Sequence, residues 1–309
     1  MVSETVRTAP GPRGRTPQTP GTRPPAAPRP PRPVRRARAG RILAIGGAIL
    51  VTLMFLFPVL WMVSISFKLP RDIFTSPPQL FSQLTTANYT SYFEQARILP
   101  RMVNTVIVAG GSAIISMVVG SMAGYALSRM RMRGAGVVGG LILASRAVPP
   151  IALVVPMFLV ARKLGLTDQY ITVILAYMTF LIPYVVWLMQ AFFRGLPREL
   201  EESAMIDGCT RFGAFFRIIV PCSLGGLVST LIYCIILAWE ELLFALVLTN
   251  DRAVTIPVAI AGMAADTEQG GLWGPLAAVG VLTVLPVVAF ALAVQKYLVK
   301  GLADGATKG

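Results

Sequence analysis

Residues 199–221 read ELEESAMIDGCTRFGAFFRIIVP and form the only long polar interval between two hydrophobic runs in the second half of the chain. Pro197 suits the first turn of a short helix here, and the acidic residues that follow would lie near the positive end of that helix. Gly208 interrupts the segment. Its apolar residues recur at steps of three and four, which predicts one apolar and one charged side. They are Met205, Cys209, Phe212 and Phe216.

The chain around this segment has the composition of a polytopic membrane protein. It has 309 residues, of which 55% are hydrophobic and 14% are charged, with a mean hydropathy of +0.68. From physics alone, residues 199–221 can therefore be a solvated loop whose apolar side rests on the bilayer surface.

The net charge of +14 is concentrated in an N-terminal tail, which argues against a nucleic-acid partner. Residues 1–41 hold ten Arg, ten Pro and a single Glu, with few large apolar residues, so we expect them to be disordered and cytoplasmic. Such a tail can bind anionic lipid headgroups or a protein, or it can simply fix the orientation of the first span. We expect no signal cleavage, because the apolar run that follows is long enough to cross a membrane.

Hydropathy predicts an all-α polytopic membrane protein with six transmembrane helices and both termini in the cytoplasm. The first run, 42–67, contains no charge and exceeds the about 20 residues that a span requires. The segments that this topology assigns to the cytoplasm carry 20 of the 28 Lys and Arg, as the positive-inside rule expects. The expected spans are 42–67, 103–127, 137–161, 170–193, 224–248 and 275–294. Span 103–127 carries Gly110-Gly111, Gly120 and Gly124, which allow close helix approach, and residues 250–274 are expected to form an external loop.

Two of the expected spans contain charged residues, which are costly in a bilayer unless they face a cavity or a counter-ion. Span 137–161 holds Arg146 ahead of Pro149-Pro150, a pair that removes two backbone donors and bends the helix. Span 224–248 holds Trp239, Glu240 and Glu241. We interpret these residues as a substrate pathway in which Arg146 pairs with Glu240 or Glu241. Alternatively, Arg146 snorkels to an interface and the carboxylates lie solvated at the outer mouth.

Several kinds of chemistry are excluded by residues that the chain lacks. It contains no His, and its three cysteines, Cys209, Cys222 and Cys234, form no C-x-x-C pair. Histidine-dependent metal sites and Ser-His-Asp or Cys-His catalysis are therefore ruled out, and a disulfide framework is not expected. There is also no G-x-x-x-x-G-K-[ST] loop to hold nucleotide phosphates. Any energy that the protein uses must then come from a partner protein or from a gradient.

Two motifs give the chain a family resemblance. Glu202-Ser203-Ala204, Gly208 and Ile218-x-Val220-Pro221 resemble the EAA loop (EAA, three residues, G, nine residues, I-x-L-P) of permease subunits of bacterial ATP-binding-cassette (ABC) importers. The end of the chain, from Gln295 to Gly309, resembles the terminal Q-x-x-x-x-x-G-L-x-x-G-A-x-K-G of the maltose-type carbohydrate permeases. The likeness covers about residues 42–309. The two departures in the loop, Ser203 for Ala and Val220 for Leu, are small or apolar.

This resemblance implies a transport subunit without an ATPase site, in a bacterial plasma membrane. Its partners would be a second permease, two copies of an ATP-binding subunit and an extracytoplasmic substrate-binding protein. No cofactor would bind the chain directly, since ATP and magnesium would bind the partner subunits. The loop would dock on the ATPase as a coupling helix. Its expected contact residues are Glu202, Ser203, Ala204, Asp207, Gly208, Phe212, Ile218 and Pro221.

The cargo implied by the resemblance is a polar, uncharged carbohydrate: a sugar, an oligosaccharide or a sugar alcohol. Residues 146–150 and 241–246 look closer to members that import sugar alcohols or α-glucosides. The family commonly has Trp-Asn-Glu where this chain has Trp239-Glu240-Glu241, so Glu240 departs from the pattern and weakens any inference about substrate there.

Two other classes of function compete with this interpretation. In a secondary transporter, Arg146, Glu240 and Glu241 would relay protons or ions, and a protonophore would abolish uptake. In a membrane-embedded enzyme, the two glutamates would act as an acid/base pair. Adjacent carboxylates on one helix diverge, however, and neither a nucleophile nor metal ligands accompany them.

Overall fold

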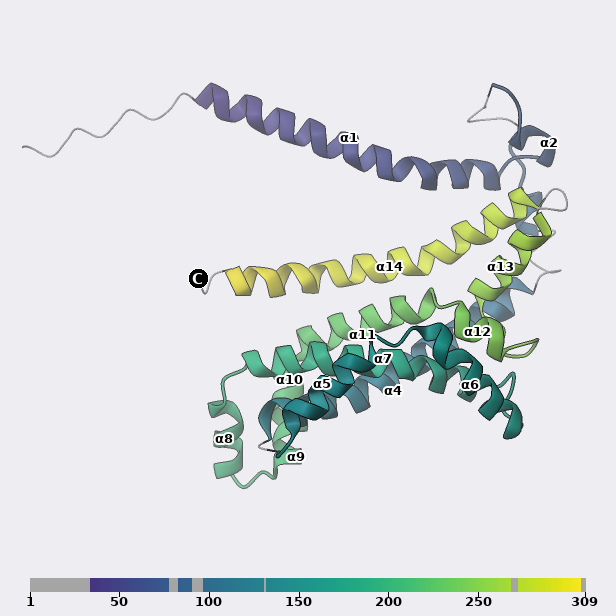
Figure 1. Ribbon diagram of the computed structural model, residues 1–309. Helices are drawn as coiled ribbons and strands as arrows, with labels where there is room; N and C mark the ends of the chain where they lie inside the picture. The colour runs from purple at the N-terminus through teal and green to yellow at the C-terminus, as the bar shows by residue number, and fades with distance from the viewer. Residues whose placement is uncertain (1–33, 78–82, 91–96, 131, 268–271, 307–309) are drawn as a thin grey trace, which may run out of the picture. The chain divides into compact units, whose positions relative to one another are not determined.

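The computed structural model describes residues 34–77, 83–90, 97–130, 132–267 and 272–306, which are almost entirely helical (Figure 1). The predicted all-α class is therefore confirmed for this part of the chain. Residues 1–33 of the predicted tail and the last three residues of the C-terminal motif lie outside the described residues. The helices in chain order are α1 (Val34–Ser66), α2 (Pro70–Ile73), α4 (Ile98–Arg129), α5 (Ala135–Ser145), α6 (Pro150–Lys163), α7 (Tyr170–Gly195), α8 (Glu199–Ile206), α9 (Arg211–Ala214), η1 (Phe215–Ile219), α10 (Val220–Cys222), α11 (Leu224–Trp239), α12 (Leu243–Leu248), α13 (Ile256–Thr267) and α14 (Trp273–Ala306).

Four of the described helices are long and apolar enough to cross a membrane. Two bent helix pairs can each count as one further span, which would bring the number of spans to six. The four are α1, α4, α7 and the Trp273–Ala293 part of α14. The bent pairs are α5 with α6, which meet at 91°, and Arg211–Cys222 with α11, which meet at 81°.

The chain divides into two compact units, residues 1–54 and residues 55–309. In the first unit, α1 begins at Val34, ahead of the predicted start of the first span at residue 42. The side chains of residues 42–54 are exposed along this helix, and most of them are large and apolar. A helix that is apolar on all sides is suited to lipid or to another subunit rather than to water.

Helices α4 and α7 pack closely against each other and form the centre of the second unit. A Cβ atom placed on Gly120 would lie 2.7 Å from the Val185 side chain, and one placed on Gly124 would lie 3.1 Å from the Val186 carbonyl oxygen. Small residues allow two helix backbones to approach in this way. The predicted close approach at these two glycines is thus confirmed, whereas Gly110 faces open space.

The predicted span 137–161 is broken at its proline pair rather than merely bent. Helix α5 ends at Ser145, Pro149 is extended (φ −61°, ψ 133°), and α6 starts at Pro150. A proline disfavours helical geometry in the residue before it, so Pro149-Pro150 stops one helix and starts the next. Arg146 lies in the turn between the two helices.

The prediction of one continuous helix over 224–248 was wrong. Helix α11 ends at Trp239, and α12 starts only at Leu243. The Glu241 carboxylate accepts hydrogen bonds from the backbone N–H groups of Phe244 (3.0 Å) and Ala245 (3.5 Å). It therefore caps the start of α12, so the two glutamates lie at a helix boundary. The following segment, expected to be an external loop, likewise contains helix α13.

Candidate functional site

The segment between α7 and α11 folds as a helix, a tight turn and a second helical arm. Helix α8 ends where Gly208 adopts φ +87°, a conformation that costs glycine little and other residues much more. The Thr210 side chain then accepts a hydrogen bond from the Gly213 N–H (3.1 Å) and caps α9. The predicted interruption at Gly208 is confirmed. The predicted single apolar side is wrong, because Met205 and Phe212 belong to different helices.

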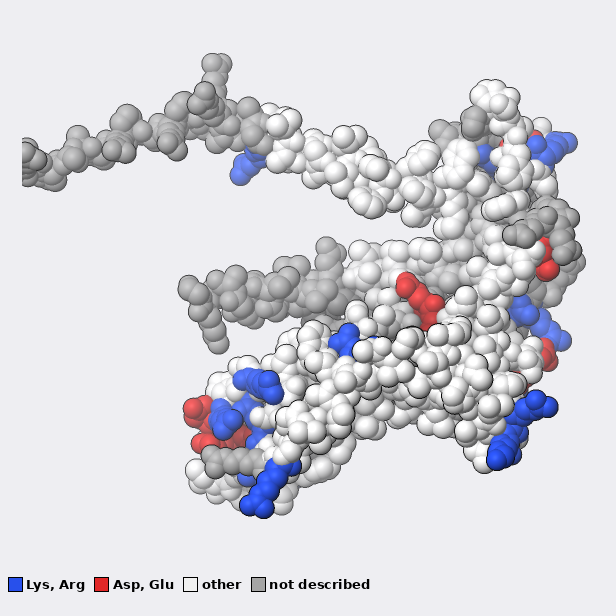
Figure 2. All heavy atoms as spheres, in the orientation of Figure 1, with Lys and Arg blue, Asp and Glu red and all other residues white. Residues whose placement is uncertain are grey.

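The expected contact residues of this segment fall on both of its faces. Ala204 is buried and Ile218 is half-buried, so they pack inward. Figure 2 shows charged side chains gathered over α8 and α9. The remaining expected contact residues are exposed: Glu202, Ser203, Asp207, Gly208, Phe212 and Pro221. These six residues are therefore accessible at the surface of the chain.

The inward face of the segment is held by α4. The Tyr125 hydroxyl donates to a carboxylate oxygen of Glu201 (2.6 Å), a residue that is only 6% exposed. The Tyr125 ring also packs on Phe215 of η1, with 4.7 Å between ring centroids. Both arms of the segment are therefore anchored by one side chain. Sequence reasoning missed this pair, since Glu201 adjoins the motif residue Glu202 and looked equivalent to it.

A second group of predicted residues meets in a cavity of about 260 Å³ at the break between α5 and α6. Arg146 and Glu241 both line this cavity, together with Tyr184 and Phe180 of α7. The Arg146 guanidinium lies 3.8 Å from the Tyr184 ring centroid and 5.4 Å from that of Trp187. Such stacking is an ordinary way to stabilise a guanidinium.

Direct pairing of Arg146 with a glutamate does not occur in this conformation. Neither Glu240 nor Glu241 comes within 4.0 Å of its guanidinium. The guanidinium stacks on the Tyr184 ring instead, and the Glu241 carboxylate accepts a hydrogen bond from the first turn of α12. Glu240 is exposed and Trp239 is buried, and neither lines the Arg146 cavity. The structure thus brings together two of the five predicted pathway residues, while Pro149 ends the turn that positions Arg146.

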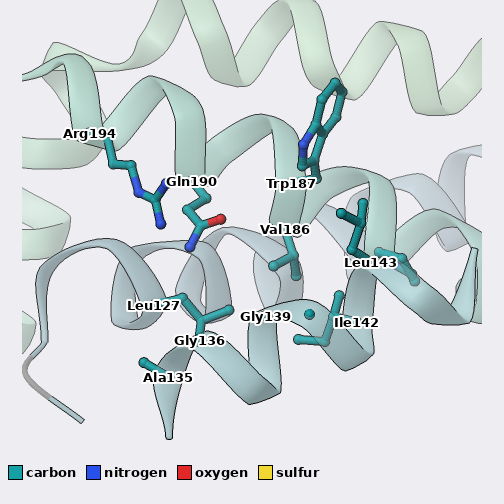
Figure 3. Close-up of a pocket in the computed structure, with 12 residues that line it drawn as sticks. Leu127, Ala135, Gly136, Gly139, Ile142, Leu143, Val186, Trp187, Gln190 and Arg194 are labelled. Atoms are coloured by element: carbon teal, nitrogen blue, oxygen red, sulfur yellow. The ribbon is translucent and has the colours of Figure 1, made fainter.

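A further cavity, of about 400 Å³, lies between α5 and α7 and involves none of the predicted residues. Figure 3 shows Gln190 and Arg194 extending from α7 toward the face of α5 that carries Gly136 and Gly139. Its walls are otherwise small or apolar. Among the described residues, no group of three or more His, Cys, Asp or Glu is placed to hold a metal ion.

At the other end of α7 from α8, a polar cluster ties the bundle together. The Asp168 carboxylate accepts hydrogen bonds from the backbone N–H groups of residues 250–253 at 2.8–3.1 Å, and we call this arrangement the Asp168 clamp. Burial alone would raise the pKa of Asp168, but together the four donors outweigh burial and hold the pKa below its ordinary value. Asn104 of α4 donates to the carbonyls of Arg252 and Val254, which fixes the same loop from a second side.

Broken apolar helices beside a tightly packed pair, with a charged helix–turn–helix segment at one end, define a multi-span membrane protein. The profile of the family described as "binding-protein-dependent transport system inner membrane component" matches residues 116–304, and the chain belongs to this family.

Known relatives agree with that assignment. The chain is 36% identical to the trehalose transport system permease protein SugB of Mycobacterium tuberculosis, over 82% of this chain and 93% of that protein. It is 35% identical to the trehalose/maltose transport system permease protein MalG of Thermococcus litoralis, over 87% and 97%. A crystal structure of a bacterial ABC transporter that imports the acidic polysaccharide alginate has the same fold, with a TM-score of 0.70, 23% identity, and 84% and 98% coverage.

Proposed function

We propose that this chain is the permease subunit of an ABC importer that moves a carbohydrate into the cytoplasm. The observation that carries the proposal is the fold of residues 199–221, which we call the docking segment. Its EAA-type motif turns at Gly208 and leaves Glu202 and Asp207 exposed. The relatives named for trehalose and maltose transport support a carbohydrate as the substrate. The family description, which mentions binding-protein-dependent transport, supports a substrate-binding protein as a partner.

The proposed assembly contains a second permease, two ATP-binding subunits and an external substrate-binding protein. We place both termini and the α8–α9 segment in the cytoplasm. Helices α5 and α6 then make one span and α11 and α12 another, which gives six spans with α1, α4, α7 and α14. The exposed apolar side chains of α1 then face lipid or the second permease. Hydrolysis takes place on the partner subunits with bound magnesium, because no P-loop motif occurs in this sequence.

In the proposed mechanism, closure of the ATP-binding subunits displaces the docked α8–α9 segment, and the bundle exchanges an outward cavity for an inward one. The broken spans line the path. The Arg146 cavity suits a sugar: its aromatic walls can stack on the ring, and the Arg146 guanidinium can donate hydrogen bonds to hydroxyl groups.

The test is sugar uptake into vesicles that contain the complete transporter and internal ATP. Gly208→Leu forces a leucine into φ +87°, and the Glu202→Lys/Asp207→Lys double variant reverses the charge of the exposed face. Each should separate the ATP-binding subunits from the membrane subunits on purification, or reduce uptake at least tenfold. Asp266→Lys, on the exposed surface of α13, is the matched charge control and should behave as wild type.

Normal uptake by both docking variants would refute the proposal. The remaining alternative is a proton-coupled transporter with Arg146 and Glu241 as relay groups, and a protonophore distinguishes the two. An ATP-driven importer continues to take up sugar when the protonophore is added, whereas a proton-coupled transporter stops.

A further inference from the structure

We propose that Tyr125 is a positioning residue that passes the movement of the docking segment to the bundle, with Glu201 as its partner on α8. This inference rests on the proposed function, because it assigns a role to residues within the same coupling machinery. It differs from the motif-based expectation, in which Glu202 and its neighbours carry the coupling contacts.

Tyr125 touches both arms of the docking segment at once. Its hydroxyl donates to Glu201 of α8 at 2.6 Å, and its ring lies 4.7 Å from the Phe215 ring of η1. Phe193, near the end of α7, completes a cluster of three buried rings, at 6.1 Å from each of the other two. Tyr125 is therefore a side chain of α4 through which a movement of either α8 or η1 can reach the bundle.

The hydrogen bond has the features of a strong one. A length of 2.6 Å is typical of a hydroxyl that donates to a carboxylate. Both residues are buried at 6% exposure, and burying a carboxylate is costly unless a donor satisfies it. Adjacent residues on a helix point about 100° apart. Glu201 can therefore face the bundle while Glu202 faces outward.

The helix that carries Tyr125 cannot yield locally. At Gly124 the backbones of α4 and α7 lie so close that even a Cβ would crowd α7, at 3.1 Å from Val186 O and 3.2 Å from Gln190 N. One turn later, Arg129 donates to the carbonyls of Phe193 and Leu196, the latter at 2.7 Å, and ties α4 to the end of α7. A push on Tyr125 thus moves α4 and α7 together rather than bending α4 alone.

A merely structural role for the pair predicts loss of assembled protein, whereas a coupling role predicts that ATP is hydrolysed without transport. The measurement that separates them is the number of sugar molecules moved per ATP hydrolysed, made on reconstituted transporter whose assembly is checked by co-purification. Tyr125→Phe removes the hydroxyl and keeps the ring. Glu201→Ala removes the acceptor from the other helix, so the same bond is broken twice by independent routes.

Both variants should assemble and should lower the sugar-to-ATP ratio about tenfold, in keeping with a hydrogen bond to a charged group. The double variant should be no worse than either single variant, since only one bond is lost. Glu201→Gln keeps an acceptor oxygen and should restore most of the ratio. The control is Ser128→Ala, because the Ser128 hydroxyl bonds only to the Tyr125 carbonyl within the same helix.

Three results would overturn the inference: an unchanged ratio in Tyr125→Phe or Glu201→Ala, additive losses in the double variant, or loss of assembled complex with a normal ratio in what remains. If Tyr125→Phe cannot be purified, Glu201→Ala and Glu201→Gln decide the question by themselves. Failure of the proposed function looks different, because wild type itself would then show no ATP-driven uptake.

Discussion

The second unit contains two kinds of helix that differ in how they are held. The central pair, α4 and α7, is unbroken and packs through glycines, with backbone nearly touching backbone at Gly124. Two neighbouring stretches are interrupted instead: α5 and α6 meet at a turn that contains Pro149-Pro150, and α11 ends before α12 at Glu240-Glu241. The interrupted helices hold the charged residues of the Arg146 cavity, and the central pair holds the anchors of the docking segment.

This contrast indicates that the two kinds of helix have different roles. We call the central pair α4 and α7 the frame, and the interrupted helices α5, α6, α11 and α12 the path. A helix that packs without space for a methyl group transmits displacement, whereas a helix with free backbone groups can house polar ligands and rearrange. The Asp168 clamp joins the two parts at one end, because its loop follows α12 and is held by Asp168, two residues before α7, and by Asn104 of α4. The frame, the clamp and the path can each be broken separately.

The largest effect should come from the frame. Gly124→Leu forces a side chain against the backbone of α7, which can relieve the clash only by separating from α4. We expect a loss of about 3 kcal/mol or more in stability, seen as a fall of roughly 10 °C in the thermal midpoint of the purified protein. The measurement is thermal unfolding in detergent, followed by loss of the folded peak in size-exclusion chromatography.

Gly110→Leu is the matched control on the same helix, since a Cβ at Gly110 meets nothing within 4 Å. It should leave the midpoint within a few degrees of wild type. Equal losses from both glycines would show that helix propensity or lipid exposure, rather than contact with α7, determines the effect.

A smaller effect is expected from the clamp. Asp168→Asn leaves one acceptor oxygen where the carboxylate has two, so about half of the hydrogen bonds to residues 250–253 are lost. Allowing for the partial exposure of Asp168, we expect about 1 kcal/mol, or a fall of roughly 3 °C in the thermal midpoint. Asp266→Asn on α13 is exposed and should have no effect.

The clamp also predicts a dependence on pH. Because folding lowers the pKa of Asp168, the ionised form binds the loop better, and its contribution is complete above the ordinary pKa of about 3.9. It is lost as the pH falls below about 4 and passes through the lowered pKa of the folded state. The difference in thermal midpoint between wild type and Asp168→Asn should therefore be constant from pH 7 to pH 5 and shrink below pH 4. A difference that grows on acidification would contradict this assignment.

Much of the frame could be predicted from the sequence, because hydropathy and glycine spacing report local properties. The runs 103–127 and 170–193 lie within α4 and α7, and the approach at Gly120 and Gly124 is as expected. The Gly208 bend was predictable for the same reason. A glycine in a polar, helix-forming stretch has few other uses.

The contacts between distant segments could not be predicted in this way. Tyr125 and Glu201 are 76 residues apart, and nothing in the sequence around either residue refers to the other. The Glu240-Glu241 helix break was also missed, since an apolar run on both sides masks a boundary that a side-chain cap creates. Arg146 lines a cavity, but the group against its guanidinium is the aromatic ring of Tyr184 rather than the carboxylate that the sequence suggested.

The smallest effects belong to the path, and they distinguish stacking from ion pairing. With Arg146 stacked on Tyr184 at 3.8 Å and no glutamate within 4.0 Å, Arg146→Ala and Tyr184→Leu should be coupled, by about 0.5–1 kcal/mol or two- to fivefold in the initial rate of uptake. Arg146→Ala and Glu240→Ala should instead be additive. Tyr184→Phe keeps the ring and serves as the control. If Glu240 couples to Arg146 more strongly than Tyr184 does, then transport passes through a conformation in which the guanidinium leaves the aromatic ring for the carboxylate, and the broken helices rearrange around an ion pair.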